Sequence, residues 1–224
     1  MNKPELPRPP LCLITDESLG ATDIVEKTAA ALGAGCRLVQ LRDRRLGTRP
    51  LLDLARRLRD LSYRHQALLV VNDRIDIALA VAADGVHLPA AGMATAAARA
   101  LVGPLALVGR SVHSPGEVAA CLQDGADYVH LGPIFDTPSK RAFGKPLGLE
   151  ILGEAAREAK TMPVFAVGGI KSGCLKAVIR AGATGAAVIS AVMQATDPAQ
   201  ASALLIGTLE EALGRQPKSG RSGA

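Results

Sequence analysis

The chain has 224 residues and a formal net charge of +5, and 48% of its residues are hydrophobic although only 2% are aromatic. This length fits one large domain or two small ones. The basic residues are spread along the chain and few aromatic platforms for bases are present, so we expect no nucleic-acid partner; small anionic ligands explain the positive balance more simply. A core of aliphatic residues without tryptophan is typical of helices packed on a buried parallel sheet.

The ends and the cysteines indicate the compartment. The four cysteines, at positions 12, 36, 121 and 174, form no CxxC pair, which predicts free thiols in a reducing cytoplasm. No apolar run reaches membrane-spanning length and the first ten residues have no signal-peptide core, so we expect a cytoplasmic protein without membrane contact. Residues 1–10 and 215–224 are predicted to be flexible ends around one domain, 11–214.

Short aliphatic runs alternate with stretches that are apolar at helical spacing. The final stretch, 198–213, predicts a closing helix with Asp197 as its N-cap. This alternation predicts a single α/β domain with a parallel sheet. The strand candidates are 11–15, 37–42, 67–72, 85–88, 105–111, 128–132, 164–167 and 186–190.

A small-residue pattern recurs where a helix leads into a strand, at 33–36, 83–86, 124–127 and 181–184. These positions precede every second strand of the series. Alternate strands contribute to the same interior layer of a closed barrel, whereas an open sheet gives no reason for such a rhythm. The sequence therefore predicts a (β/α)8 barrel.

In such a barrel the functional groups lie at the carboxyl ends of the strands. Polar residues follow six of the eight predicted strands: Gln40 with Arg42 and Arg44, Asn72 with Asp73, Ser111 with His113, the loop of Thr137, Ser139 and Lys140, Gly168 with Gly169, and Ile189 with Ser190. Each group alone could be a cap or an ordinary loop residue. Six strand ends of this kind favour a site.

Two anion-binding regions are predicted. Gly168 and Gly169 let the backbone approach a phosphate closely, and the ends of strands seven and eight commonly hold phosphate in barrels. Arg42, Arg44 and Lys140 supply cations for a second anionic group. Asp73 could hold Mg²⁺ through a diphosphate, because magnesium often takes only one or two protein carboxylates.

The histidines differ in their expected roles. His113, just after a strand end, is the candidate general acid–base residue. His87 and His130 are expected to be structural, and His65 solvated. Because no catalytic triad or zinc-ligand spacing is present, hydrolase and zinc-enzyme functions have no support.

Taken in order, the motifs resemble the thiamine phosphate synthase superfamily over roughly residues 11–213. They are Gln40-Leu41-Arg42, Val71-Asn72-Asp73-Arg74, Asp84-Gly85-Val86-His87-Leu88, Ser111-x-His113, Gly132-Pro133-Ile134-Phe135-x-Thr137-x-Ser139-Lys140, Gly168-Gly169-Ile170 and Ile189-Ser190-Ala191. The resemblance implies a (β/α)8 transferase that joins hydroxymethylpyrimidine diphosphate to hydroxyethylthiazole phosphate and releases pyrophosphate.

The resemblance also implies residue roles. Gln40, Arg42, Asn72, Ser111 and Lys140 would handle the pyrimidine diphosphate with Asp73 on Mg²⁺, Thr137 and Ser139 would lie between the substrates, and Gly169, Ile189 and Ser190 would hold the thiazole phosphate. The expected catalytic residues are Arg42, Ser111, His113 and Lys140.

The sequence departs from the synthase pattern after His87-Leu88, where Pro89-Ala90-Ala91-Gly92 lacks the second magnesium-binding Asp. Arg44 stands where the synthase has Lys. Several motifs are closer to a sister branch, the thiazole tautomerases, which work without metal and for which His113 would be the base; a barrel that only binds a phosphorylated ligand or a partner protein is a third alternative. The oligomeric state is left open, with a homodimer as one alternative, and loop 141–148 is expected to close over ligand.

Overall fold

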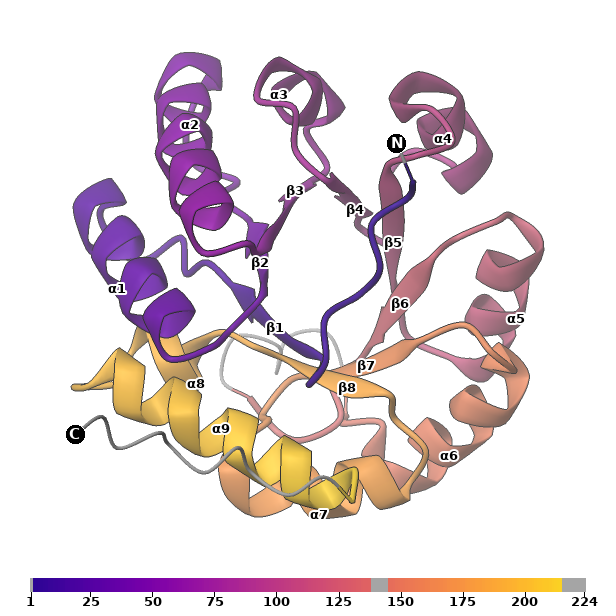
Figure 1. Ribbon diagram of the computed structural model, residues 1–224. Helices are drawn as coiled ribbons and strands as arrows, with labels where there is room; N and C mark the ends of the chain where they lie inside the picture. The colour runs from indigo at the N-terminus through magenta and orange to yellow at the C-terminus, as the bar shows by residue number, and fades with distance from the viewer. Residues whose placement is uncertain (1, 138–144, 215–224) are drawn as a thin grey trace.

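The computed structural model describes residues 2–137 and 145–214. Eight parallel strands form a closed barrel in chain order, surrounded by helices, as the sequence predicts (Figure 1). The strands are β1 (Leu11–Ile14), β2 (Leu38–Leu41), β3 (Leu68–Asn72), β4 (Gly85–Leu88), β5 (Leu107–Val112), β6 (Tyr128–Leu131), β7 (Val164–Val167) and β8 (Gly185–Val188). The helices are α1 (Ala21–Gly33), α2 (Thr48–Arg64), α3 (Ile75–Ala80), α4 (Thr95–Val102), α5 (Pro115–Gln123), α6 (Gly148–Ala159), α7 (Ser172–Arg180), α8 (Ser190–Met193) and α9 (Pro198–Ala212).

The main difference from the predicted elements lies at the last strand. We expected a strand over 186–190, but β8 ends at Val188 and Ser190 begins the short helix α8. The closing helix α9 is confirmed, and the Asp197 side chain accepts a hydrogen bond from the backbone N–H of Gln200 at 3.0 Å.

The repeat before alternate strands has a structural role. Asp84, Asp127 and Thr184 precede β4, β6 and β8, and their side-chain oxygens accept hydrogen bonds from the backbone N–H groups of Leu69, Val108 and Val164 on the preceding strands. Asp127 also contacts Arg99 at 2.5 Å and Lys3, and Asp84 contacts Arg59 at 2.7 Å. These side chains fasten neighbouring strands at the amino end of the barrel.

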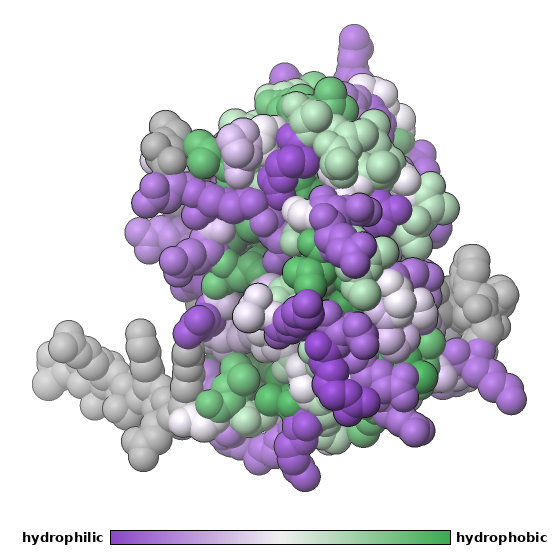
Figure 2. All heavy atoms as spheres, turned by 90° about the vertical axis from the view of Figure 1, so that its right-hand side faces the viewer, coloured by the Kyte–Doolittle hydropathy of each residue, from purple (hydrophilic) through white to green (hydrophobic). Residues whose placement is uncertain are grey.

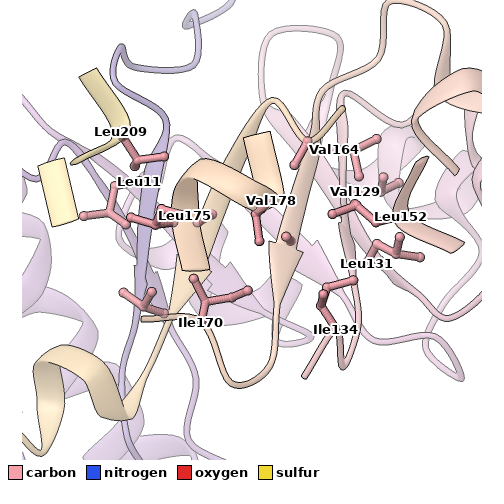
Figure 3. Packing of buried hydrophobic residues seen from close by; sticks show 14 of the residues in the cluster. Leu11, Val129, Leu131, Ile134, Leu152, Val164, Ile170, Leu175, Val178 and Leu209 are labelled. Carbon is pink, nitrogen blue, oxygen red and sulfur yellow. The ribbon is translucent and has the colours of Figure 1, made fainter. Parts of the chain in front are cut away.

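The hydrophobic core has an outer layer and an interior layer. Outside the barrel, Val129, Leu131 and Val164 of β6 and β7 pack with residues of the surrounding helices, including Leu152, Leu175 and Val178 (Figure 3). Inside, aliphatic side chains surround the buried rings of Tyr128 and Phe165. Because strand residues alternate between the two faces, each strand contributes to both layers.

The segment before β1 crosses the amino end of the barrel (Figure 1). Leu6 packs against the interior cluster, Lys3 pairs with Asp127, and the Pro10 carbonyl accepts a hydrogen bond from the N–H of Ala186 at 3.0 Å. We expect residues 1–10 to be flexible, and this expectation remains a prediction. The tail 215–224 lies outside the described residues.

One face of the barrel is apolar where α4 lies, near the top of the view in Figure 2. Met93, Leu101 and Leu105 are exposed there, among alanines. The sequence did not single this face out, because alanine gives little contrast between the two sides of a helix. Among the described residues, none of the helices is both long and apolar enough to span a membrane.

Candidate active site

The loops after β6 and β7 lie directly against each other at the carboxyl end of the barrel. The N–H of Ile134 donates to the Val167 carbonyl at 2.9 Å, and that of Phe135 to the Gly168 carbonyl at 3.1 Å. Gly168 and Gly169 have φ values of +92° and +67°, and a Cβ on Gly169 would lie 2.8 Å from Phe135 Cβ. Both the backbone conformation and the close approach therefore require glycine here.

The end of β8 lies beside this glycine pair, because β7 and β8 are neighbouring parallel strands. Ile189 is half-buried, and Ser190 is exposed at the first position of α8. Gln194, just after α8, donates to the Asp16 carboxylate at 2.9 Å and so ties this corner to the loop after β1. Backbone N–H groups and the Ser190 hydroxyl could donate hydrogen bonds to a phosphate here.

Gln40 and Asn72 form a polar pair at the ends of β2 and β3. Gln40 Nε2 donates to Asn72 Oδ1 at 3.2 Å, and the Gln40 side chain is buried. Its Oε1 atom is buried without a hydrogen-bond partner among the described residues. A buried acceptor of this kind is costly unless a ligand or water satisfies it, so Gln40 Oε1 is suited to an N–H group of a ligand.

Arg42 and Arg44 share a carboxylate that sequence reasoning missed. Glu17, in the loop after β1, lies 3.5 Å from Arg42 Nη1 and 2.5 Å from Arg44 Nη2. The hydrogen bond from Arg44 lowers the pKa of Glu17 to about 2. Burial, and then the nearby Arg44, lowers the pKa of Arg42. An incoming anion must therefore compete with Glu17 for these cations.

Ser111, at the end of β5, is joined to a buried polar cluster. Its Oγ lies 2.9 Å from His87 Nε2, and His87 Nδ1 lies 3.3 Å from the Tyr128 hydroxyl. The rings of His87 and His130 are 4.2 Å apart. Burial lowers the pKa of His130 to about 3, and burial followed by the neighbouring His130 lowers the pKa of His87 well below its usual value. Both rings are therefore neutral near pH 7.

His113 lies just past β5, and its ring is fixed by the neighbouring strand. Nδ1 lies 2.5 Å from the Gly132 carbonyl oxygen, and the backbone N–H donates to Glu117 at 2.7 Å. Because a carbonyl can only accept, Nδ1 must carry the proton. In the neutral form of this exposed side chain the lone pair is therefore on Nε2, where a general base needs it.

The carboxylates at this end fit only a loosely held metal. Asp73 is exposed and has a positive φ of 62°. The loop after β4, where a second carboxylate would stand, is neutral, and Arg110 donates to its Ala90 and Met93 carbonyls at 2.9 and 2.7 Å. Within 2–137 and 145–214, no group of three or more His, Cys, Asp or Glu side chains could hold a metal. A Mg²⁺ ion at Asp73 would have to take most of its ligands from a diphosphate and from water.

Most of the expected site residues lie at one end of the barrel. The structure places Gln40, Arg42, Arg44, Asn72, Asp73, Ser111, His113, Thr137, Gly168, Gly169, Ile189 and Ser190 at or just beyond the strand ends. Ser139 and Lys140 lie outside the described residues, as does the first half (141–144) of the expected lid 141–148. Glu17, His87 and Tyr128 join the site through contacts that their sequence positions do not reveal.

A (β/α)8 barrel whose rim combines glycine amides, a helix start and arginines defines the class of barrels that act on phosphorylated small molecules. Residues 11–192 match the family model described as thiamine monophosphate synthase, and the chain belongs to this family of enzymes of thiamin biosynthesis.

Named relatives agree with this assignment. The chain is 46% identical over 187 residues to a thiamine-phosphate synthase of Gloeobacter violaceus, which covers 84% of this chain but 54% of that protein. It is 41% identical over 203 residues to the thiamine-phosphate synthase of Chlorobium limicola, covering 91% of this chain and 95% of that protein. The solved thiamine phosphate pyrophosphorylase of Pyrococcus furiosus superposes with a TM-score of 0.83 at 37% identity, over 91% of this chain and 96% of that one.

Proposed function

We propose that this protein joins hydroxymethylpyrimidine diphosphate to hydroxyethylthiazole phosphate and releases pyrophosphate. The observation that carries the proposal is the orientation of Gln40. Its amide nitrogen is engaged by Asn72, and its buried oxygen has no partner among the described residues. An amino group on a flat heterocycle would satisfy that acceptor at the floor of the rim, with the diphosphate directed toward Arg42.

The thiazole phosphate would occupy the other side of the rim. Gly168 and Gly169 would let the backbone approach the phosphate closely, and Ser190 would supply a hydroxyl at the start of α8. These groups would hold the phosphate through hydrogen bonds, whereas Arg42 would hold the diphosphate through its charge, so the two regions would differ chemically. Thr137, at the edge of the described residues, would stand between the two substrates.

The reaction needs charge stabilisation and positioning rather than a protein nucleophile. The bond between the pyrimidine methylene carbon and the diphosphate oxygen breaks, and its electron pair leaves with the diphosphate. The thiazole nitrogen lone pair then forms the new C–N bond. Arg42 and the Ser111 hydroxyl would stabilise the leaving diphosphate, together with Lys140. A Mg²⁺ ion near Asp73 would supply further positive charge to the diphosphate.

A coupling assay tests this proposal. Purified protein is mixed with both substrates and Mg²⁺, and thiamine phosphate is quantified. We expect Gln40→Leu to lower kcat/KM about a hundredfold, because the variant loses both the buried acceptor oxygen and the amide nitrogen that donates to Asn72. Gln123→Leu, at an exposed position of α5, is the matched control and should leave the rate unchanged. Equal rates for the two variants would overturn the role of Gln40.

A second candidate function is favoured by the geometry of His113. Its Nδ1 donates to the Gly132 carbonyl, so Nε2 of the neutral ring would be the atom that accepts a proton from a thiazole carboxylate phosphate, as in the tautomerases. This function predicts deuterium uptake into that compound in D₂O without metal, abolished by His113→Asn. If the protein shows neither coupling nor exchange but binds thiazole phosphate, it acts as a binding barrel.

A further inference from the structure

The buried hydroxyl of Tyr128 and the ring of His87 form a hydrogen-bonded series that ends at Ser111. The two contacts are 3.3 Å, from the tyrosine oxygen to His87 Nδ1, and 2.9 Å, from His87 Nε2 to Ser111 Oγ. Tyr128 and His87 are 0% and 1% exposed. Ser111 is half-buried at the rim, so the series runs from the barrel interior to the candidate site.

The direction of the hydrogen bonds follows from the phenol. Burial is the main cause that raises the pKa of Tyr128 well above its usual value, so the hydroxyl keeps its proton. A buried O–H needs an acceptor, and among the described residues His87 Nδ1 is the one within reach. When Tyr128 donates to Nδ1, neutral His87 must carry its proton on Nε2.

The proton on Nε2 determines what Ser111 can do. Nε2–H donates to Ser111 Oγ, which occupies an acceptor position of that oxygen. The serine's own hydrogen is then not used in the contact with His87 and can be donated to another acceptor. We propose that Tyr128 and His87 are positioning residues that present the Ser111 hydroxyl as a hydrogen-bond donor to the diphosphate of the substrate.

The residues around this series must leave room for it and keep His87 uncharged. A Cβ on Gly109, on the neighbouring strand β5, would lie 2.1 Å from Tyr128 Cζ, so only glycine leaves room for the tyrosine ring. His130 packs 4.2 Å from His87, and positive charge on His87 is disfavoured by burial and then by this neighbour. The arrangement holds His87 in its neutral form, in which one nitrogen accepts while the other donates.

The first test is direct and independent of catalysis. Long-range ¹H–¹⁵N correlation spectra of the full chain distinguish protonated from unprotonated imidazole nitrogens, and His87→Gln assigns the His87 signals. We expect Nε2 of His87 to be protonated in the wild-type protein and protonation to move toward Nδ1 in Tyr128→Phe. A wild-type His87 protonated on Nδ1 would overturn the proposal, whether or not the protein couples the two substrates.

The second test rests on the proposed function and uses a double-mutant cycle. Tyr128→Phe should lower kcat/KM for the pyrimidine diphosphate about tenfold in the wild-type background and have almost no effect in Ser111→Ala. Tyr63→Phe, which changes the other tyrosine, 78% exposed on α2, is the control.

If no coupling is detected, calorimetric binding of inorganic pyrophosphate replaces the rate in the same cycle, so failure of the proposed function does not obscure the result. Equal effects of Tyr128→Phe in both backgrounds would indicate a purely structural tyrosine and contradict the proposal.

Discussion

The Glu17 carboxylate lies 3.5 Å from the Arg42 guanidinium while its main hydrogen bonds go to Arg44. Glu17 thus links the loop after β1 to two arginines that follow β2. The carboxylate holds the two arginines at the rim, and an anionic ligand that pairs with them would compete with it. The affinity for an anionic ligand should therefore depend on the free energy needed to break the ion pairs of Glu17 with Arg42 and Arg44.

Removing that competition should strengthen anion binding. We expect Glu17→Gln to bind inorganic pyrophosphate about threefold to tenfold more tightly, because a neutral amide holds the arginines less firmly than a carboxylate. Isothermal titration calorimetry at two salt concentrations measures the effect. Glu26→Gln makes the same charge change at an exposed position of α1 and should leave the affinity nearly unaltered; weaker binding by Glu17→Gln would show that the carboxylate only organises the site.

The glycine pair after β7 should tolerate no side chain. In Gly169→Ala, the new Cβ meets Phe135 and the Asp136 carbonyl within 3 Å while φ stays at +67°. We expect a loss of about 2 kcal/mol in the free energy of unfolding, measured in urea, and weaker binding of thiazole phosphate. Gly173→Ala, where nothing lies within 4 Å of the new Cβ, should not destabilise the fold. Similar losses for both variants would argue against the close approach of the two loops.

The fastening at the amino end of the barrel should affect stability without changing activity. Asp127→Asn weakens the contacts to Lys3 and Arg99 and the hydrogen bond from Val108. We expect a loss of about 2 kcal/mol in the free energy of unfolding with kcat unchanged, since the site is at the opposite end. Asp124→Asn, exposed at the end of α5, is the control. A large fall in kcat with normal stability would contradict this separation of roles.

Acid should destabilise the protein through His130. Its pKa is lowered from an ordinary 6.5 to about 3 by burial, so between those values the unfolded chain binds more protons than the folded chain. The contribution of neutral His130 to the free energy of unfolding is therefore fully present above the ordinary pKa of 6.5, and it falls as the pH drops below that value. Between about pH 7 and about pH 5, His130 alone should cost about 2 kcal/mol. His130→Leu should reduce this pH dependence in urea unfolding, whereas His65→Leu should retain it; an unchanged slope in His130→Leu would refute the assignment.

The barrel and the location of its site at the carboxyl ends of the strands could be predicted, because both follow from local sequence patterns. Aliphatic runs end in polar residues, and parallel strands bring those ends together, as with Gln40 and Asn72. The repeat before alternate strands predicts a barrel from sequence alone, whereas its side chains' role as acceptors of backbone hydrogen bonds follows only from the structure.

Other features depend on contacts between distant residues. Glu17 and Arg44 are 27 positions apart, and no local pattern links them. The sequence does not show why Gly109 must be glycine; in the structure, the Tyr128 ring fills the space where its Cβ would lie. The apolar run before Ser190 predicts a strand that extends to this residue, whereas β8 ends at Val188 and Ser190 begins α8.

The central claim is that the two regions of the rim hold two substrates for one coupling reaction. A single-turnover experiment tests it most directly: excess protein with Mg²⁺, the pyrimidine diphosphate and the thiazole phosphate, with thiamine phosphate and pyrophosphate measured over time. We predict that the two products form in equal amounts and only when both substrates are present. Pyrophosphate release without thiamine phosphate, or deuterium exchange into the thiazole carboxylate phosphate with no coupling at all, would contradict the account.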